Sequence, residues 1–293
     1  MSFETSAPRL RVETEEDRDY FLRLADCMKK PNCKRLYALC RNAYEIQKYI
    51  LSSRLTPEDV ELIMEKTAVL HPPQKTLVSE REFEQKHHTD KIHFIFIGGA
   101  FFIKGGREML QVLSEFEGVY DFKLTLISAL LYDDYFTHTS YDEMVECRNF
   151  IKDKAWIDYY EVLPNEEVLE KCKQANVGML PSVADTYGYS VLEMQAAGCP
   201  VITTNIRAFP EINSAECGWI CRLPVNELRF CTVRDTKDWS PILQGELRRC
   251  FQEIFRHPEI IREKGRMAME RIRRMHDPYR YQERLKRDLF SDV

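Results

Sequence analysis

The sequence of 293 residues contains no run of about 18 uncharged apolar residues, the length that a membrane-spanning helix needs. Its first twenty residues, "MSFETSAPRLRVETEEDRDY", lack the basic and then apolar segments of a secretory signal, so we expect a cytoplasmic protein. The chain also lacks an excess of positive charge. Its 42 basic and 47 acidic side chains give a net charge of −5, which does not favour nucleic acid as a partner.

The ten cysteines include no Cys-x-x-Cys pair. In a long chain without a signal segment, reduced thiols are a better interpretation than a disulfide framework. Cys217, Cys221 and Cys231 come nearest to a metal-binding group, but the residues between the first two are typical of a strand. A strand would hold Cys217 and Cys221 about 13 Å apart, too far for one zinc ion. We therefore predict no metal site. No cofactor is predicted for the chain either.

Apolar runs and helical segments alternate from Lys91 onward. The apolar runs lie at 92–99, 122–130, 156–163, 177–182, 200–205 and 218–223. Such alternation is typical of βαβ units and of a parallel sheet covered by helices on both faces. It predicts an α/β fold with a Rossmann-like, doubly wound parallel sheet, in which ligands bind at the carboxyl ends of the strands.

The segments before and after this region are less regular. Helices are predicted after Thr14 and Thr56, each an N-cap, and short strands at 34–40 and 67–73. The polar stretch 74–91 reads as a linker, and the last 50 residues as two or three helices. The predicted domains are a short mixed N-terminal segment (1–90), a Rossmann-like domain (91–245) and C-terminal helices that pack back on it (246–293).

A binding site for a phosphate-bearing sugar is suggested by "PSVADTYGYSVLEMQAAGCPVITTN", which begins at Pro181. An apolar run ends there, a loop follows, and a helix begins near Gly188. Free N–H groups and the positive end of the dipole at a helix start favour an anion. Asp185 in the loop can accept hydrogen bonds from sugar hydroxyls, and Glu193 in the helix can bind both hydroxyls of a ribose. The alternative is a loop acid and a solvated helix residue.

The same segment resembles the donor-binding core of the retaining glycosyltransferases of family 4, which have the two-domain GT-B fold. The family pattern is Pro-Ser, two residues, an acid, two residues, glycine, four residues, glutamate and a small-residue run ending in Gly-x-Pro-Val. The matching positions are Pro181, Ser182, Asp185, Gly188, Glu193, Ala196, Gly198, Pro200 and Val201. The resemblance implies a GT-B donor domain that binds a nucleoside-diphosphate sugar, either a UDP-sugar or a GDP-sugar.

A second segment, "FIFIGGAFFIKGG", resembles the first strand of that donor domain and the helix start after it. The resemblance implies that Gly98 and Gly99 let the main chain approach the diphosphate. Lys104 would stabilise the leaving group as a metal does elsewhere; the alternative is an exposed lysine at a helix start. Two positions depart from the family: no arginine shortly precedes Lys104, and Asp185 replaces the commoner glutamate.

The neighbours of Asp185 receive roles from the same resemblance, which makes Lys104 and Asp185 the candidate catalytic residues. Main-chain groups after Asp185 would contact the donor sugar and then its diphosphate, and the loop after the 156–163 run would border the nucleobase. Ring packing is an equal alternative for the two tyrosines. The predicted contacts are Thr186, Tyr187 and Gly188 for the sugar, Tyr189 and Ser190 for the diphosphate, and Glu161, Val162 and Leu163 for the base.

The predicted function is a retaining, metal-independent, hexosyltransferase-like glycosyltransferase. Its acceptor is unknown: a glycan, a lipid-linked sugar or a small molecule. The resemblance covers about 91–289 and, faintly, 35–73, so the acceptor domain looks incomplete. Two alternatives follow: a nucleotide-sugar-binding protein without catalysis, or the donor half of a transferase whose acceptor domain lies on a second polypeptide. No role is assigned to His71, His87, His88 or His93.

Two weaker signals are set aside. Asp17-Arg18-Asp19 matches the Asp-x-Asp of metal-dependent glycosyltransferases, but acidic residues at a predicted helix start explain it better. Residues 246–288 carry 13 basic and 8 acidic side chains. This local excess leaves peripheral contact with an anionic membrane open, although the interleaved charges favour a solvated helix face.

Overall fold

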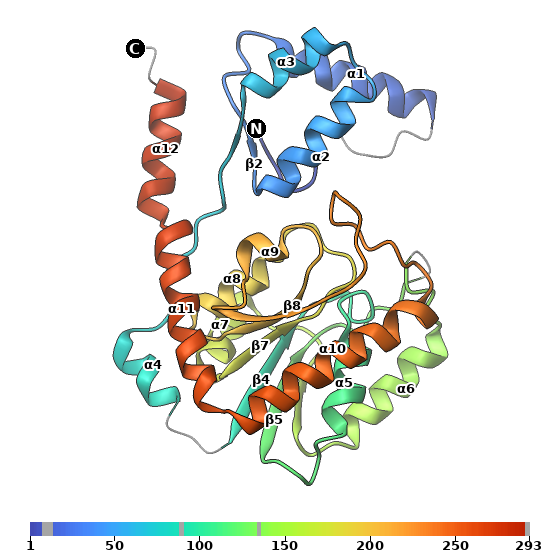
Figure 1. Ribbon diagram of the computed structural model, residues 1–293, viewed down its shortest axis with the longest axis vertical. Helices are drawn as coiled ribbons and strands as arrows, with labels where there is room; N and C mark the ends of the chain where they lie inside the picture. Colours follow the sequence, from blue (N-terminus) through green and yellow to red (C-terminus); the bar gives the residue numbers. More distant parts are fainter. Residues whose placement is uncertain (8–13, 88–90, 134–135, 291–293) are drawn as a thin grey trace. The chain divides into compact units, whose positions relative to one another are not determined.

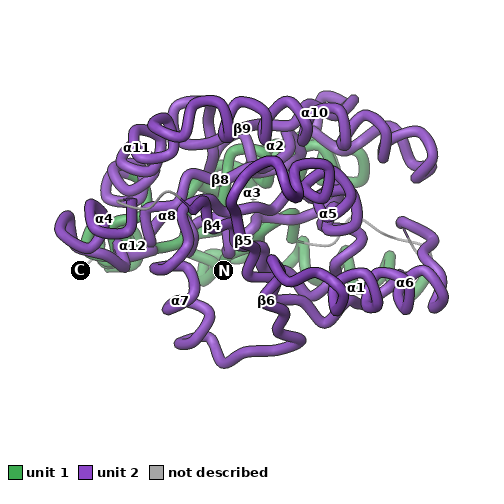
Figure 2. The backbone as a smooth tube through the Cα atoms, turned by 90° about the horizontal axis from the view of Figure 1, so that it is seen from below, with its two compact units in different colours: residues 1–73, 275–293 green, residues 74–274 purple. Residues whose placement is uncertain are grey.

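The computed structural model describes residues 1–7, 14–87, 91–133 and 136–290 (Figure 1). Two compact units make up the chain (Figure 2). Unit 1 consists of Met1–Pro73 with Met275–Val293, and unit 2 of Gln74–Arg274. These boundaries differ from those of the three predicted domains, a division that stays a prediction.

The sheet of unit 2 has six parallel strands in the order β6-β5-β4-β7-β8-β9. Each of the six apolar runs forms one of these strands, and β7 and β8 are buried along their whole length because helices cover both faces. The predicted Rossmann-like α/β fold is confirmed. The strands are β4 (Ile92–Ile97), β5 (Phe122–Ile127), β6 (Ile157–Tyr160), β7 (Val177–Leu180), β8 (Val201–Thr204) and β9 (Gly218–Cys221).

The strand order reverses between β4 and β7. Successive connections lead outward from β4 to β5 and β6, and the chain then returns to β7 and continues to β8 and β9. Because parallel crossovers are right-handed, helices of the two halves cover opposite faces of the sheet. The crossover helices are α5 (Gly106–Ser114), α6 (Tyr141–Lys152), α7 (Asn165–Gln174) and α8 (Tyr189–Ala196). Helix α5 packs on α10 (Thr236–Arg256), and α7 on α8 (Figure 1).

Phenylalanines hold α10 against the first half of the sheet. Phe94 on β4 meets Phe251 and Phe255 of α10 edge to face, with ring centroids 5.5 and 5.8 Å apart. Each such pair contributes about 0.5–1.5 kcal/mol beyond the burial of its area. Their packing places α10, and the α5 helix that lies on it, in a fixed position beside β4.

The predicted linker at 74–91 instead contains a helix, α4 (Glu80–Lys86). A capping box formed by Ser79 and Glu82 begins the helix, and its one large apolar residue, Phe83, is fully buried against Val78 and Met269. The linker prediction was wrong because a helix needs only one deep apolar anchor when its neighbours are polar. The Ser-x-x-Glu spacing at its start was the signal available in the sequence.

Unit 1 contains a second, smaller parallel sheet in the order β1-β2-β3. The predicted N-caps Thr14 and Thr56 are confirmed, and each accepts a hydrogen bond from a main-chain amide three residues later. The strands are β1 (Ser2–Phe3), β2 (Leu36–Ala38) and β3 (Thr67–Val69), and the helices between them are α1 (Glu15–Lys29), α2 (Arg41–Ser52) and α3 (Pro57–Glu65).

The last helix, α12 (Pro278–Phe290), belongs to unit 1, whereas α10 and α11 (Glu259–Met275) lie almost wholly in unit 2. The Tyr37 hydroxyl of β2 donates a hydrogen bond to Asp288 of α12 at 3.2 Å. Helix α12 therefore differs from the predicted arrangement, in which all of 246–293 packs on the Rossmann-like domain.

Candidate functional site

The loops that follow β4 and β7 meet where the strand order of unit 2 reverses. Lys104 lies in the first loop, and Asp185 in the second. In doubly wound sheets the crevice at such a reversal, outside the carboxyl ends of the strands, is where ligands bind. The structure thus brings together the two predicted catalytic residues, which are 81 positions apart in the sequence.

Hydrogen bonds join these two loops to each other. The Val183 amide donates to the Ile103 carbonyl at 2.9 Å, and the Ser182 hydroxyl to the same carbonyl at 3.3 Å. The Thr204 hydroxyl at the end of β8 donates to the Ser182 carbonyl at 2.6 Å. The ends of β4, β7 and β8 therefore hold the main chain beside Lys104 and Asp185 in one fixed arrangement.

Gly105 allows the two loops to approach closely. Its φ of +69° is a left-handed conformation, and a Cβ at this position would lie 2.4 Å from the Pro181 carbonyl oxygen. A side chain would therefore both strain the main chain and push the loops apart. Gly105 is also the N-cap of α5, so helix and loop depend on the same residue.

An ion pair joins the two predicted catalytic side chains. Lys104 Nζ lies 2.9 Å from Asp185 Oδ2, with side chains only 22% and 10% exposed. Gly98 makes room for the lysine, because a Cβ there would lie 2.3 Å from Lys104 Cδ. At Gly99 no atom lies within 4 Å of a Cβ position, so this main chain is open to approach. Lys104 is thus directed toward the loop after β7.

Helix α8 begins in this loop with Gly188 as its N-cap, at a φ of +88°. A Cβ on Gly188 would lie 2.5 Å from the Phe209 ring, which belongs to α9 (Phe209–Ile212). The close packing of the Phe209 ring therefore requires a glycine at position 188, whether or not a ligand also approaches the main chain there. The N-caps of α5 and α8 are both glycines without a capping side chain, so the positive ends of two helix dipoles lie at the reversal.

The predicted sugar and diphosphate contacts surround the start of α8. The Tyr187 amide donates to Asp185 Oδ1 at 3.3 Å, and the Ser190 hydroxyl to the Ile97 carbonyl at 3.4 Å. The Tyr187 ring is fully buried, so packing accounts for its side chain, whereas Tyr189 is 45% exposed. Thr186 is exposed as well.

Glu193 lies on α8 and is partly buried. Burial raises the pKa of its carboxyl, and a hydrogen bond from Asn165 acts in the opposite direction. Asn165 Nδ2 lies 3.5 Å from Glu193 Oε1. Because Asn165 begins α7, directly after the loop that carries Glu161, Val162 and Leu163, this contact places Glu193 near the predicted nucleobase loop.

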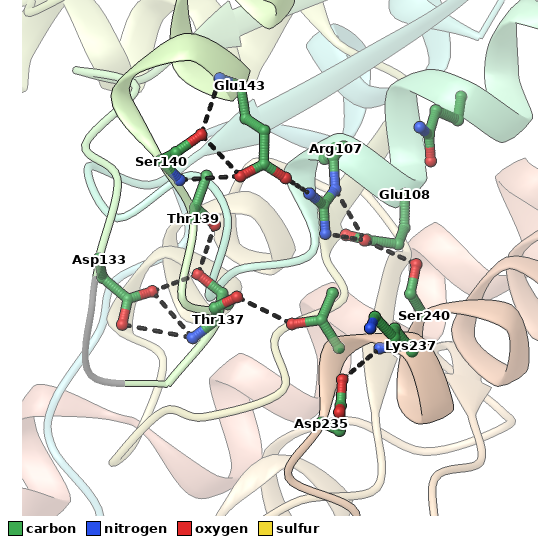
Figure 3. Close-up of polar contacts among 12 residues, drawn as sticks. Arg107, Glu108, Asp133, Thr137, Thr139, Ser140, Glu143, Asp235, Lys237 and Ser240 are labelled. Carbon is green, nitrogen blue, oxygen red and sulfur yellow. Dashed lines mark hydrogen bonds and ion pairs between the residues drawn. The ribbon is translucent and has the colours of Figure 1, made fainter.

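A polar network fixes the first turn of α5, two residues after Lys104 (Figure 3). Arg107 bonds Glu143 at 2.9 Å and Glu108 at 3.1 Å, and the Ser240 hydroxyl donates to the same Glu108 oxygen at 2.8 Å. Glu108 is fully buried. The network attaches the start of α5 to α6 and α10, and so supports Lys104 from the helix side.

Four residues that support the site from outside it were not predicted from the sequence: Gly105, Ser182, Asn165 and Glu108. Gly105 follows Lys104 directly, and Ser182 stands in the family pattern, so both carried a readable signal. Asn165 and Glu108 act through residues 28 and 132 positions away, which no local pattern shows.

The four histidines without an assigned role include one in the core. His93 on β4 bonds Thr125 Oγ1 at 2.8 Å, and burial lowers its pKa to about 4, so it is a neutral packing residue. His88 lies outside the described residues. Among the side chains that the structure describes, no three His, Cys, Asp or Glu gather as metal ligands would. None of the described helices combines the length and apolar character needed to cross a bilayer.

The candidate site lies within the part of the chain that matches a known protein family. Residues 91–228 match the model of the family described as glycosyl transferases group 1, and this segment contains the loops after β4, β6, β7 and β8. No curated protein matches the chain. The match supports a glycosyltransferase.

Solved structures are similar over nearly the whole chain. Sucrose-phosphate synthase from Thermosynechococcus elongatus has a TM-score of 0.63 at 14% identity, covering 100% of this chain and 68% of that one. HepE from Anabaena in complex with UDP and glucose has 0.66 at 10%, covering 96% and 68%. A glycosyltransferase from Rickettsia africae has 0.61 at 13%, covering 98% and 70%. Such low identities show the fold alone.

Replacing Gly105 by alanine should destabilise unit 2 more than the same change at Gly118. Both glycines have a positive φ, +69° and +75°, but only at Gly105 would the new Cβ meet the main chain. We expect a loss of about 1 kcal/mol for Gly118→Ala and at least twice that for Gly105→Ala. Chemical denaturation of the purified variants measures both, and equal losses would contradict the close contact between the loops.

Replacing Glu193 by glutamine should stabilise the protein at neutral pH. Because the folded pKa lies above the ordinary value of 4.5, folding favours the protonated carboxyl, and stability falls as pH rises through this window. Glutamine has no such ionisation, so Glu193→Gln should raise the melting temperature by about 1–2 °C at pH 7.5. The gain in melting temperature should vanish near pH 4. An equal gain at pH 4 and pH 7.5 would show that the pKa of Glu193 is not raised by folding.

Proposed function

We propose that the chain is a retaining, metal-independent glycosyltransferase that transfers a sugar from a UDP-sugar or GDP-sugar to an acceptor. The observation that carries this proposal is the meeting of Lys104 with the Asp185 loop and the start of α8 at the reversal between β4 and β7. The family match over 91–228 supports it independently.

The leaving group of such a reaction is a nucleoside diphosphate, whose negative charge increases as the glycosidic bond breaks. Groups that are already oriented toward this charge lower the barrier without reorganisation. Lys104 would supply a positive charge, and the starts of α5 and α8 would supply main-chain amides and dipoles. Together these groups do what a divalent metal does in other transferases, which is why we propose metal independence.

The remaining predicted residues have matching proposed roles. Asp185 would bind the donor sugar, Glu193 the ribose hydroxyls, and the loop of Glu161, Val162 and Leu163 the base. The position of Glu193 beside Asn165, at the end of that loop, supports this order along the donor. HepE from Anabaena, a structure with a similar fold, contains UDP and glucose. Retention of configuration rests on the resemblance to family 4.

The acceptor would be a glycan, a lipid-linked sugar or a small molecule. A nucleotide-sugar-binding protein without catalysis, or a donor half completed by a second polypeptide, are the rival proposals. Both rivals share the donor site with the main proposal, but in both of them the isolated chain would bind the donor without transferring its sugar.

Removing the charge of Lys104 should weaken nucleotide binding. We expect Lys104→Met to lower the affinity for UDP or GDP about 10- to 100-fold, the loss of one hydrogen bond to a charged partner. Lys152→Met, at the exposed end of α6, is the matched control and should bind as the wild type does. Isothermal titration calorimetry measures the affinities of the wild type and of both variants. A wild type that binds neither nucleotide would refute the proposal.

Turnover should not require a divalent metal. Incubation of the purified chain with UDP-glucose or GDP-mannose and a crude glycan extract should release nucleoside diphosphate at the same rate with and without EDTA. The anomeric configuration of the product, read by NMR, should equal that of the donor. Nucleotide binding without transfer would favour the two rival proposals, and an inverted product would contradict retention.

A further inference from the structure

The Asp185 carboxylate accepts hydrogen bonds from two groups to which the proposed function gives a role in donor binding. One of its oxygens accepts a hydrogen bond from Lys104 Nζ at 2.9 Å, and the other from the Tyr187 amide at 3.3 Å. The first of these donors is the proposed ligand of the diphosphate, and the second is a proposed contact of the sugar. Asp185 and the bound donor therefore depend on the same two hydrogen-bond donors.

The surrounding main chain keeps this carboxylate next to the lysine. The Val183 amide, two positions before Asp185, donates a hydrogen bond at 2.9 Å to the carbonyl of Ile103, which directly precedes Lys104. The lysine stem lies over Gly98, where a Cβ would come within 2.3 Å of it. A diphosphate that reaches Lys104 Nζ must therefore approach within a few ångströms of the Asp185 carboxylate.

Because the site is largely buried, the repulsion between the Asp185 carboxylate and a bound diphosphate is only weakly screened. The Lys104 and Asp185 side chains are 22% and 10% exposed, so water screens their charges less than it screens those of a surface pair. A carboxylate and a diphosphate next to one lysine repel each other while both are attracted to it. Transfer of the sugar leaves one more negative charge on the departing diphosphate, which would tighten its hold on Lys104.

We propose that Asp185 weakens the binding of the nucleoside diphosphate because its carboxylate competes with the diphosphate for Lys104. The ion pair of Asp185 with Lys104 forms again as this product leaves. The inference rests on the proposed function and adds no chemical step to it. Asp185 would thus keep the product from remaining bound after transfer, in addition to contacting the donor sugar.

A purely structural role for Asp185 makes the opposite prediction. If the carboxylate only braces the loop for the donor, its removal should loosen the loop and weaken nucleotide binding. If it competes with the diphosphate, its removal should strengthen binding and slow dissociation. The sign of the change therefore separates the two roles.

The experiment compares the wild type with Asp185→Asn, Asp185→Ala and Asp185→Glu, using UDP and GDP as probes. Asp158→Asn, on the exposed side of the edge strand β6, is the matched control. We expect about ten-fold tighter nucleoside diphosphate binding by calorimetry for Asp185→Asn and Asp185→Ala. Stopped-flow measurements should place this gain in a slower dissociation rate. Asp185→Glu keeps the charge and should stay within about three-fold of the wild type.

Thermal unfolding of each variant confirms first that it is folded, and the three substitutions guard against the loss of any one. Equal or weaker nucleotide binding by Asp185→Asn and Asp185→Ala, beside a wild type that binds, would overturn the inference and leave the donor site in place. A wild type that binds neither UDP nor GDP would remove both the inference and the proposed function.

Discussion

The hydrogen bond between the Val183 amide and the Ile103 carbonyl is the contact on which the candidate site depends. It joins the loops after β4 and β7 at the point where the order of the sheet reverses. The Ser182 hydroxyl bonds the same carbonyl, and the ion pair of Lys104 and Asp185 also joins the two loops. With these contacts, a cation, a carboxylate and two helix N-termini occupy one small region, an arrangement suited to a ligand that carries both hydroxyls and negative charge.

The rest of unit 2 keeps this region in place from several sides. Gly105 permits the close approach of the loops, and Gly188 permits the Phe209 ring to cover the start of α8. The network of Arg107 and Glu108 attaches α5 to its neighbours, while the phenylalanines of β4 and α10 hold α10 against the sheet. Each of these features restricts the main chain more than the side chains that would meet a donor. We propose that the main chain held in this way forms a frame for the negatively charged part of the donor.

Much of this arrangement could be predicted from the sequence because its signals are local. Apolar runs of strand length gave all six strands of unit 2, and the spacing from Pro181 to Val201 located the start of α8. The order of the strands, the pairing of Lys104 with Asp185 and the contact of Asn165 with Glu193 required the folded chain, because their partners are far apart in sequence. The helix α4 was missed because one buried phenylalanine, Phe83, outweighs six polar neighbours. The roles of Gly98 and Gly188 also include packing against Lys104 and Phe209, which the sequence could not show.

A crystal structure of the full chain soaked with UDP, and in parallel with GDP, tests the central claim most directly. The account predicts diphosphate oxygens about 3 Å from Lys104 Nζ and beside the first amides of α8, the distance of a charge-assisted hydrogen bond. A nucleotide bound elsewhere on unit 2, with Lys104 still paired only to Asp185, would contradict it.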